Sequence, residues 1–464
     1  MGLFKHTESQ KPALKIVIVG SGNVGTTLVE QLTREGNDVA LIDKNAKKVA
    51  ELSNLYDVMG VVGNGATYTV QKEAGVDDAD LFIAVTDSDE LNLLCCTVAK
   101  HSGKCAAIAR VRTPDYSAEI DFLKSQLGLA MIINPDLEMA RETARLFYMP
   151  DALEVNAFAH ETADLIKFKV PKNNVMDHVT IADFAKHDNA NILICAVERN
   201  GEVSIPNGDF MIEAGDTVSF ITPRKRKREF LKLLDFDTTP VKDCLMVGGG
   251  RSSYYLSRIL INMGIKVKII ELDQDRCDQL SVLLPNAIII NGDGTDEKLL
   301  KEAGIETVDS FVSLTNIDET NIFLTMHANQ ISNAKVITKI KRMNFKSIIN
   351  GMDLGSVIYP RYITAEAIVA YARAKRASLS SEVETMYHMY DNRVEAIEFS
   401  VDGKSPVTDT PIRKLILKDH VMLSFINRHG QIILPTGDDQ IKVGDTVMVV
   451  TTHFGFNNLT DILA

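Results

Sequence analysis

A glycine-rich hexapeptide near the N-terminus has the residue types and the spacing of a phosphate-binding loop. It consists of Gly20, Ser21, Gly22, Asn23, Val24 and Gly25. The first glycine permits a tight turn, the second lets the backbone approach a pyrophosphate, and the third lets the following helix lie close to a sheet. The N-terminus of that helix offers free N–H groups and a partial positive charge to phosphate oxygens.

An acidic residue completes this fingerprint. Asp43 lies 23 residues after Gly20, at the end of the next apolar run. Its carboxylate would accept hydrogen bonds from a ribose diol and would repel a 2′-phosphate. The first loop therefore predicts a site for NAD or an adenosine nucleotide and not for NADP.

A second, altered copy of the loop begins 228 residues after the first. It consists of Gly248, Gly249, Gly250, Arg251, Ser252 and Ser253, and Glu271 replaces Asp43 at the same spacing. Ser253 replaces the third glycine, so we expect the helix to be pushed slightly away from the sheet. Arg251 would either contact a phosphate or replace the charge of a missing ligand. The sequence leaves open whether this second loop binds a nucleotide.

Further polar residues follow the apolar runs that we expect to be parallel strands, and ligands of such sheets bind at the carboxyl ends of the strands. In the first copy these residues are Asn64, Gly65, Thr86, Asp87, Glu90 and Arg110. In the second copy they are Asp293, Thr315, Asn316, Glu319 and Lys339. Arg110 has two interpretations: a cation that reaches a phosphate or a neighbouring subunit, or one half of a surface ion pair.

The elements that must position these residues occur twice, because the chain is an internal repeat. The segment KEAG at 72–75 recurs at 301–304, and TDSDELN at 86–92 recurs as TNIDETN at 315–321. Ten of the twenty residues of 199–218 are identical in 428–447. The nearly constant offset of 228 to 229 residues indicates a duplication of almost the whole chain.

Each copy begins with apolar runs that alternate with segments of helical periodicity. In the first copy the expected strands are 15–20, 38–42, 58–62, 81–85, 106–111 and 130–133. The expected helices are 24–34, 90–100 and 136–150. Continuous apolar strands separated by helices predict a doubly wound, Rossmann-like parallel sheet. Residues 155–221, with their Asn-Gly and Gly-Asp turns, predict a small β-rich module instead.

The fold class is therefore α/β, with two tandem Rossmann-like domains, each followed by a small α+β module. We place the four domains at 14–150, 151–236, 241–380 and 381–464. The polar segment 235–242 is the expected linker, and we interpret the basic run at 224–229 as a solvated helix start.

Composition narrows the classes of function. The net charge of −12 argues against a nucleic-acid partner, and no apolar stretch is long enough to span a bilayer. We expect residues 1–13 to be a polar tail and the protein to be cytosolic, without direct membrane insertion. None of the six cysteines forms a CxxC pair, and we expect Cys95 and Cys96 to pack as small apolar residues. No motif predicts a metal site.

The motifs, doubled and in this order, resemble the regulatory subunits of Trk-type potassium uptake systems, the TrkA family. The resemblance covers residues 14–464 and rests on GSGNVG, IDKN (42–45), KEAGVDDADLFIAVTDSDELN (72–92), ARVRTPDY (109–116) and the GDTV ends of both modules. It implies two RCK_N (TrkA-N) domains and two RCK_C (TrkA-C) modules in a homotetrameric ring. It also implies docking on the inner face of the cell membrane against a potassium-transporting, TrkH-like subunit.

The same resemblance implies the ligands and the residues that hold them. Family members bind NAD(H), ATP and ADP. The first site would comprise Gly20 to Val24 with Asp43, Thr86, Asp87 and Arg110. The second would comprise Gly248 to Ser252 with Glu271, Asp293 and Lys339.

Two other classes of function remain as alternatives. An NAD-dependent oxidoreductase needs a catalytic domain and a general acid or base, but a small β module follows each Rossmann-like domain and no histidine lies in a motif shared by both copies. A DNA-binding regulator needs a helix-turn-helix and a basic face, and the sequence contains neither. The sequence therefore predicts a non-enzymatic, nucleotide-binding regulator that acts allosterically.

Overall fold

The computed structural model describes most of the chain in two compact units. The described residues are 13–147, 152–158, 162–187, 193–223, 241–342, 348–349, 351–380, 382–390 and 393–464. Unit 1 comprises Met1–Pro135 and Arg361–Ser381, and unit 2 comprises Asp136–Pro360 and Glu382–Ala464. The basic run at 224–229 and most of the expected linker lie outside the described residues.

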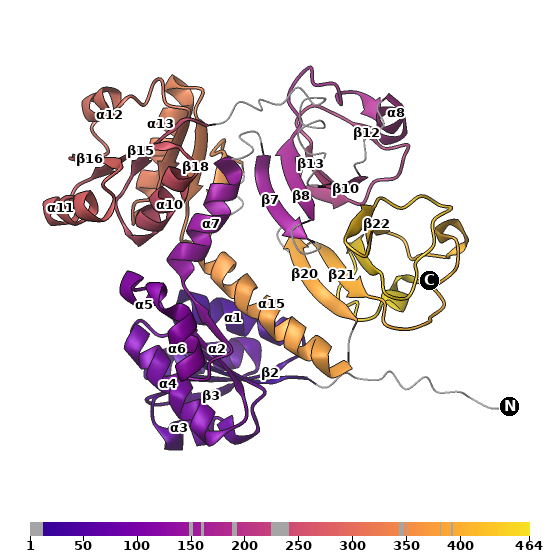
Figure 1. Ribbon diagram of the computed structural model, residues 1–464, viewed down its shortest axis with the longest axis horizontal. Coiled ribbons are helices and arrows are strands. Elements are labelled where there is room, and N and C mark those ends of the chain that lie inside the picture. The colour runs from indigo at the N-terminus through magenta and orange to yellow at the C-terminus, as the bar shows by residue number, and fades with distance from the viewer. Residues whose placement is uncertain are drawn as a thin grey trace. The chain divides into compact units, whose positions relative to one another are not determined.

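Unit 1 contains the first Rossmann-like sheet (Figure 1). Its six parallel strands follow the order β3-β2-β1-β4-β5-β6. Their bounds are β1 Lys15–Val19, β2 Asp38–Asp43, β3 Met59–Val62, β4 Leu81–Ala84, β5 Ala106–Arg110 and β6 Met131–Ile133. Each end lies within one residue of the prediction. The strand order reverses between β1 and β4, which places the expected ligand crevice at their carboxyl ends.

Helices cover both faces of this sheet. They are α1 Asn23–Arg34, α2 Ala46–Tyr56, α3 Tyr68–Glu73, α4 Asp89–Ser102, α5 Pro114–Ala118, α6 Ile120–Gln126 and α15 Pro360–Ser380, with a 3-10 turn at Val76–Asp78. Alternate strand residues point to opposite faces, so Ile16 and Ile18 pack with α1 while Val17 and Val19 pack with α4. Cys95 and Cys96 are fully buried in the second of these cores and unpaired, which confirms their predicted packing role.

The helix α15 is contributed to unit 1 by a distant part of the chain. Figure 1 labels this helix and α1. Ala365, Ile368 and Val369 lie in the same buried core as residues of α1. Arg373 Nε donates to the Glu35 carboxylate at 3.0 Å, beyond the end of α1. This segment was expected to complete the second Rossmann-like domain at 241–380, and its membership of unit 1 was not predicted.

Unit 2 contains the second Rossmann-like sheet, in the equivalent order β16-β15-β14-β17-β18-β19. Its strands are β14 Asp243–Val247, β15 Lys266–Glu271, β16 Ala287–Asn291, β17 Ser310–Ser313, β18 Lys335–Lys339 and β19 Ser356–Ile358. Its helices are α10 Arg251–Asn262, α11 Gln274–Leu283, α12 Glu297–Ala303 and α13 Asp318–Ile331. The helix α7, Pro135–Phe147, follows β6 in the chain but belongs to this unit from Asp136 onward. The predicted end of α7 at residue 150 lies outside the described residues.

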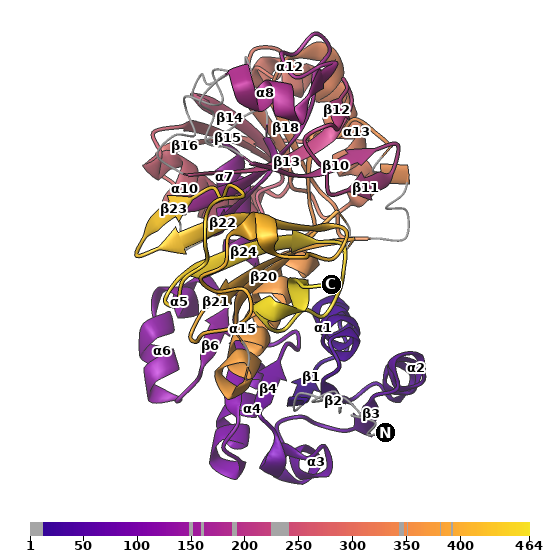
Figure 2. The same cartoon turned by 90° about the vertical axis from the view of Figure 1, so that its right-hand side faces the viewer.

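The two small modules of unit 2 are antiparallel sheets. The first has the order β11-β10-β13-β8-β7 and the second the order β20-β21-β24-β22-β23. Figure 2 labels the strands of the second module. The first contains β7 Ala152–Phe158, β8 Ala163–Lys169, β10 Leu193–Arg199, β11 Glu202–Ser204 and β13 Thr217–Pro223, with β9 Val179–Thr180, α8 Ile181–His187 and β12 Met211–Ile212 beside them. The second contains β20 Val383–Met389, β21 Val394–Ser400, β22 Val421–Arg428, β23 Gln431–Ile433 and β24 Thr446–Thr451, with 3-10 turns at Ile412–Lys414 and Leu459–Ile462.

The repeated Gly-Asp-Thr-Val motif has a structural cause in these modules. The buried Asp216 carboxylate accepts two hydrogen bonds from the Arg199 guanidinium, each at 2.7 Å. Asp445 and Arg428 form the same bidentate pair at 2.8 and 2.7 Å. The pair fixes the turn before the last long strand of each module, which explains why both residues are identical in the two copies.

The two modules pack on each other through a shared apolar core. Ala196 and Ile221 of the first module and Phe425 and Met448 of the second lie in one buried cluster. The Tyr390 hydroxyl lies 2.8 Å from Ser219 Oγ across this interface. One face of each module is therefore covered by the other module.

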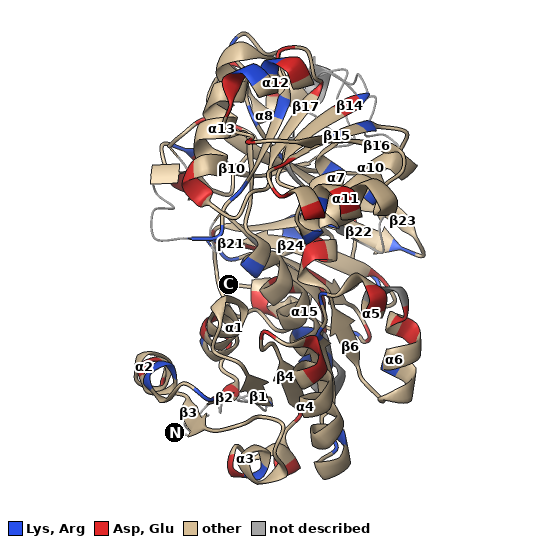
Figure 3. Ribbon diagram, turned by 90° about the vertical axis from the view of Figure 1, so that its left-hand side faces the viewer, with Lys and Arg blue, Asp and Glu red and all other residues tan. Residues whose placement is uncertain are grey.

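The surface carries charges of both signs. Figure 3 shows acidic and basic positions interspersed along α12. In this helix Lys301 pairs with Glu297 at 2.8 Å. Within the described residues, no helix combines the length and the apolar character needed to cross a membrane.

Candidate nucleotide-binding sites

The first glycine loop shows the three roles that its spacing predicts. Gly20 has φ of +109°, and a Cβ there would lie 3.0 Å from the backbone nitrogen of Thr86. A Cβ on Gly25 would lie 1.8 Å from the Gly20 carbonyl oxygen, whereas one on Gly22 would have no atom within 4 Å. Gly20 thus makes the turn, Gly25 permits the close helix, and open space remains in front of Gly22.

The mouth of this loop presents free backbone donors. Gly22 and Asn23 are exposed, and no side chain caps the N-terminus of α1. Among the described residues, no carbonyl or side chain accepts a hydrogen bond from the N–H groups of Asn23 and Val24. These donors and the positive end of a twelve-residue helix form a suitable cradle for an anionic group.

The Asp43 carboxylate lies against the loop, as its position in the sequence predicts. Its Oδ2 accepts hydrogen bonds from the backbone N–H of Ser21 at 2.6 Å and from the Ser21 hydroxyl at 2.7 Å. Its Oδ1 accepts from Asn45 N–H at 2.8 Å. Burial alone would raise the pKa of Asp43, but the hydrogen bonds from Asn45 and Ser21 and the charge of Lys48 outweigh it and lower the pKa. The carboxylate is therefore ionised at neutral pH and ready to accept from a hydroxyl.

The ends of β4 and β5 are joined by one buried amide. Asn92 Oδ1 accepts from Thr86 N–H at 2.8 Å and from the Thr86 hydroxyl at 2.7 Å. Its Nδ2 donates to the carbonyls of Thr86 at 3.1 Å and Arg110 at 2.9 Å. Asn92 is fully buried and thus fixes two of the predicted site residues relative to each other.

Arg110 is buried at the end of β5, and its ion-pair partner lies on the surface. Its Nη2 donates to the Thr86 carbonyl and lies 3.3 Å from the Asp87 carboxylate, which is fully exposed. Burial, followed by repulsion from Arg112, lowers the pKa of Arg110, and Asp87 partly offsets this. The Nε of Arg110 is buried without a hydrogen-bond partner. A buried cation with an unused donor favours an anionic partner at this edge.

The remaining predicted residues of the first copy have local roles. Asn64 is exposed, and its side-chain oxygen accepts from Ala66 N–H at 3.3 Å in the turn before α3. Glu90 accepts from Ser88 Oγ at 2.9 Å and from the Tyr116 hydroxyl at 3.2 Å, so its carboxylate is held on α4.

The second loop keeps the turn but differs at the third glycine position. Gly248 has φ of +100°, and a Cβ on Gly250 would again have no atom within 4 Å. Ser253 is fully buried, and its hydroxyl donates to the Gly248 carbonyl. The serine is thus accommodated by a hydrogen bond to the turn that Gly25 touches directly in the first copy.

The surroundings of the second loop also differ from those of the first. Glu271 Oε2 accepts from Gly249 N–H at 2.5 Å, as Asp43 does in the first copy. Arg276 Nε donates to the Gly249 carbonyl at 2.8 Å. The Ser252 hydroxyl donates to the carboxylate of Asp136, the first residue of α7 in this unit, at 2.6 Å.

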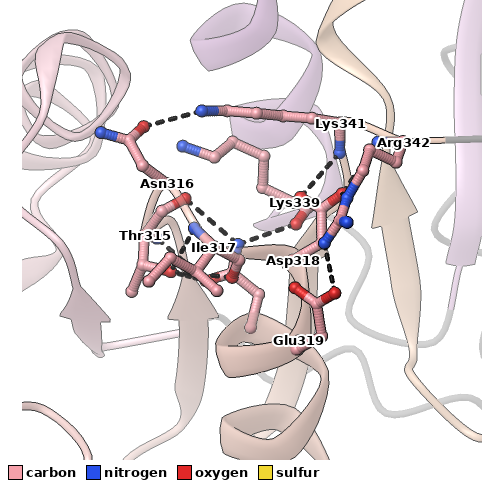
Figure 4. Close-up of polar contacts among 9 residues, drawn as sticks. Thr315, Asn316, Ile317, Asp318, Glu319, Lys339, Lys341 and Arg342 are labelled. Carbon is pink, nitrogen blue, oxygen red and sulfur yellow. Dashed lines mark hydrogen bonds and ion pairs between the residues drawn. The ribbon is translucent and has the colours of Figure 1, made fainter.

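The strand ends of the second copy repeat the amide arrangement of the first. Figure 4 shows Thr315 and Lys339 at these ends. Asn321 bonds Thr315 and the Lys339 carbonyl with the same four hydrogen bonds. Lys339 replaces Arg110, and its Nζ donates to the Leu314 carbonyl at 2.7 Å. Lys341 Nζ donates to the Asn316 side chain at 2.8 Å.

Two further acidic residues of this copy take structural partners. Glu319 pairs with Arg342 (Figure 4). Asp293 accepts from Thr295 N–H at 2.9 Å and from its hydroxyl at 2.8 Å, which lowers the pKa of Asp293. The structure thus brings together the glycine loop and the acidic residue in each copy, and places the other predicted residues along the same sheet edge.

Sequence reasoning did not assign roles to Asn92, Asn321 or Asp136. The first two are signalled by the repeat, because Thr86 to Asn92 and Thr315 to Asn321 have the same spacing within the matched heptapeptides. No sequence signal links Asp136 to the second loop. Within the described part of the chain, no three His, Cys, Asp or Glu side chains are grouped to hold a metal ion.

Comparison with known proteins identifies the family. The TrkA-N domain matches residues 16–135 and 244–360, and the TrkA-C domain matches 165–235 and 396–464. The "Trk system potassium uptake protein TrkA" of Vibrio alginolyticus is 30% identical over 94% of this chain and 95% of its own length. This chain belongs to the TrkA family. The protein of the same name in Haemophilus influenzae is 29% identical over the same shares of each chain.

Solved structures share the fold of this TrkA family member. "GsuK channel bound to NAD" superposes with a TM-score of 0.62 over 95% of this chain and 77% of that chain, at 15% identity. "Crystal Structure of the GsuK RCK domain" superposes with a TM-score of 0.63 over 95% of this chain and 93% of that chain, at 14% identity. The predicted family and the predicted fold class, in which a small module follows each Rossmann-like domain, are therefore confirmed.

Proposed function

We propose that this protein is the cytosolic regulatory subunit of a Trk-type potassium uptake system and that an adenine nucleotide bound at the first glycine loop controls it. The observation that carries this proposal is the loop itself, where unpaired N–H groups at the start of α1 face open space beside the ionised Asp43. The relatives named "Trk system potassium uptake protein TrkA" support the physiological role.

The residues of the first site favour NAD(H), ADP or ATP. The free N–H groups of the α1 N-terminus would hold phosphate oxygens. Asp43 uses three of about four acceptor positions of its carboxylate on Ser21 and Asn45, so one position remains for a ribose hydroxyl. A 2′-phosphate at that place would meet the Asp43 charge, which disfavours NADP. That a channel of the same fold is bound to NAD supports the choice.

The site also has a route for sensing its ligand. The Ser21 hydroxyl and backbone N–H are held by Asp43, so a ribose hydroxyl on the remaining acceptor position of this carboxylate would connect the ligand to the turn before α1. The core that contains α1 also contains α15, which begins at the boundary of the two units. A coupling free energy of about 1–3 kcal/mol between nucleotide binding and the conformational equilibrium of the transporter would shift that equilibrium 5–150-fold.

The proposed assembly follows the family. The protein would form a homotetrameric ring on the inner face of the membrane, attached to a TrkH-like potassium-transporting subunit. An oxidoreductase remains the alternative, but the protein is best understood as a non-enzyme. The relatives that share almost the whole length of this chain are named as potassium uptake proteins, which supports this choice.

Calorimetry with NAD, NADH, ADP and ATP tests the binding step. The wild-type chain should bind at least one of these ligands, and Asp43→Ala should weaken that binding. Glu271→Gln is the matched control, because it alters the equivalent residue of the second copy and leaves the first site intact. Equal affinity of wild type and Asp43→Ala would refute the proposed site.

A further inference from the structure

The two small modules meet through the same face of each. Leu165 lies opposite Ile221 in the first module, and Ala396 lies opposite Val450 in the equivalent strands of the second. All four side chains belong to the shared buried core. Contact between equivalent faces is the arrangement of a symmetric dimer, so the apolar core alone would also permit the pairing of two first modules or of two second modules.

The polar contacts of this interface are not symmetric. Tyr390 of the second module places its hydroxyl 2.8 Å from Ser219 Oγ and its ring centroid 4.6 Å from Lys167 Nζ. Both partners belong to the first module, where Lys167 lies opposite Ser219 in the pairing of β8 with β13. Tyr390 is 4% exposed. A cation over an aromatic face is worth more in such a desolvated place than at the surface.

The repeat puts different residues in the equivalent places. In the second module Glu398 lies opposite Met448, where the first module has its lysine and serine. In the sequence Ala159 precedes β8 by the same four residues by which Tyr390 precedes β21. Two second modules would therefore bring a carboxylate to the electron-rich face of Tyr390 and a thioether to its hydroxyl. Two first modules would have alanine in the place of the tyrosine.

A second polar contact has the same asymmetry. Arg393 of the second module pairs with the Glu198 carboxylate of the first and donates to the Gly201 carbonyl. In the repeat Thr162 corresponds to Arg393, and Asn427 corresponds to Glu198. A pair of like modules would lose this ion pair, whichever of the two modules it contained.

We propose that these polar contacts make the module interface selective, so that a first module pairs with a second module and not with another first module. The second module is selective in the same way. The apolar core is common to every pairing, so discrimination comes from the contacts that like modules would lose or turn into repulsion. Because the two modules of one chain are tethered, the selected pairing forms within the chain, and this face does not join like modules of neighbouring copies.

A variant that gives the first module the face of the second tests this selectivity in the full chain. Lys167→Glu combined with Ser219→Met puts the residues of the second module in front of Tyr390. Hydrogen exchange, measured by mass spectrometry, should become about tenfold faster or more in β8, β13, β21 and β24, because both faces open together. Lys169→Glu is the matched control, since it makes the same change of charge at an exposed residue of the same strand and should leave exchange unchanged.

A charge exchange in the second contact distinguishes recognition from a failure to fold. Arg393→Glu should also accelerate exchange in these four strands, and its combination with Glu198→Arg should restore exchange to within about threefold of the wild type. Unchanged exchange in the variant of Lys167 and Ser219 overturns the proposal, as does a charge exchange that restores no protection. Faster exchange confined to β8 and β13 also overturns it, because the first module alone would then be destabilised.

Discussion

The amide that joins the ends of β4 and β5 gives a quantitative prediction. Replacing Asn92 with alanine removes four hydrogen bonds in a fully buried position. The Thr86 carbonyl keeps its bond from Arg110, and the Thr86 hydroxyl keeps the Ser88 carbonyl as a partner. The Thr86 N–H and the Arg110 carbonyl lose the partner that Asn92 supplied.

The buried Arg110 carbonyl costs about 1–3 kcal/mol without a partner and the partly buried Thr86 N–H costs less, so Asn92→Ala should destabilise this edge by about 1–4 kcal/mol. Because Thr86 and Arg110 lie at the proposed site, the affinity for nucleotide should fall by at least tenfold. The chain has several domains and a single unfolding free energy is poorly defined for it. Hydrogen exchange measured by mass spectrometry resolves the effect locally, in peptides that cover β4 and β5.

Asn321→Ala is the matched control, because it removes the same four hydrogen bonds from the second copy. It should accelerate exchange in β17 and β18 and leave nucleotide affinity at the first site unchanged. Exchange in β4 and β5 that is unaltered by Asn92→Ala, together with unchanged nucleotide affinity, would refute the reasoning.

Three further predictions concern the first copy. Gly25→Ala should unfold or displace the start of α1 and abolish nucleotide binding, because its Cβ would lie 1.8 Å from the Gly20 carbonyl oxygen; binding that survives, measured by calorimetry, would show that the loop has room. The pKa of Asp43 is lower in the folded protein than its ordinary value of 3.8, so the ionised carboxylate stabilises the fold at pH values above 3.8, and this stabilisation is lost as the pH falls through the folded pKa. Ser21→Ala removes one of the hydrogen bonds that lower this pKa and should therefore raise it. An unchanged titration of Asp43, followed by NMR, would contradict the assignment of this hydrogen bond. Burial raises the pKa of Cys95 to about 12, so its thiol should resist a thiol reagent at pH 8 in the folded protein, and rapid labelling that mass spectrometry locates at this residue would contradict its burial.

The sequence predicted the strands of the first sheet to within one residue because they are continuous apolar runs between clear helical periods. It predicted the turn at Gly20 and the place of Asp43 because backbone sterics and ribose recognition demand those residue types at that spacing. These features are local in the chain. The fold class and the family followed from the doubling of such local signals.

The features that escaped prediction depend on contacts between distant segments. The apolar face of α15 fits a sheet but does not say which sheet, so its membership of unit 1 could not be read from its periodicity. The contact of Asp136 with Ser252 follows from the corresponding placement of α7 in unit 2. Arg110 was expected at the strand end, but only the structure shows its Nη2 on the Thr86 carbonyl.

The most direct test of the central claim is rubidium flux through a Trk-type potassium-transporting subunit reconstituted in liposomes with this protein. With wild-type protein, flux should change on the order of 5–150-fold as NADH or ADP is titrated, and Asp43→Ala should shift this response to higher concentrations. A flux that is independent of every adenine nucleotide, in vesicles where the two proteins are shown to be associated, would contradict the account.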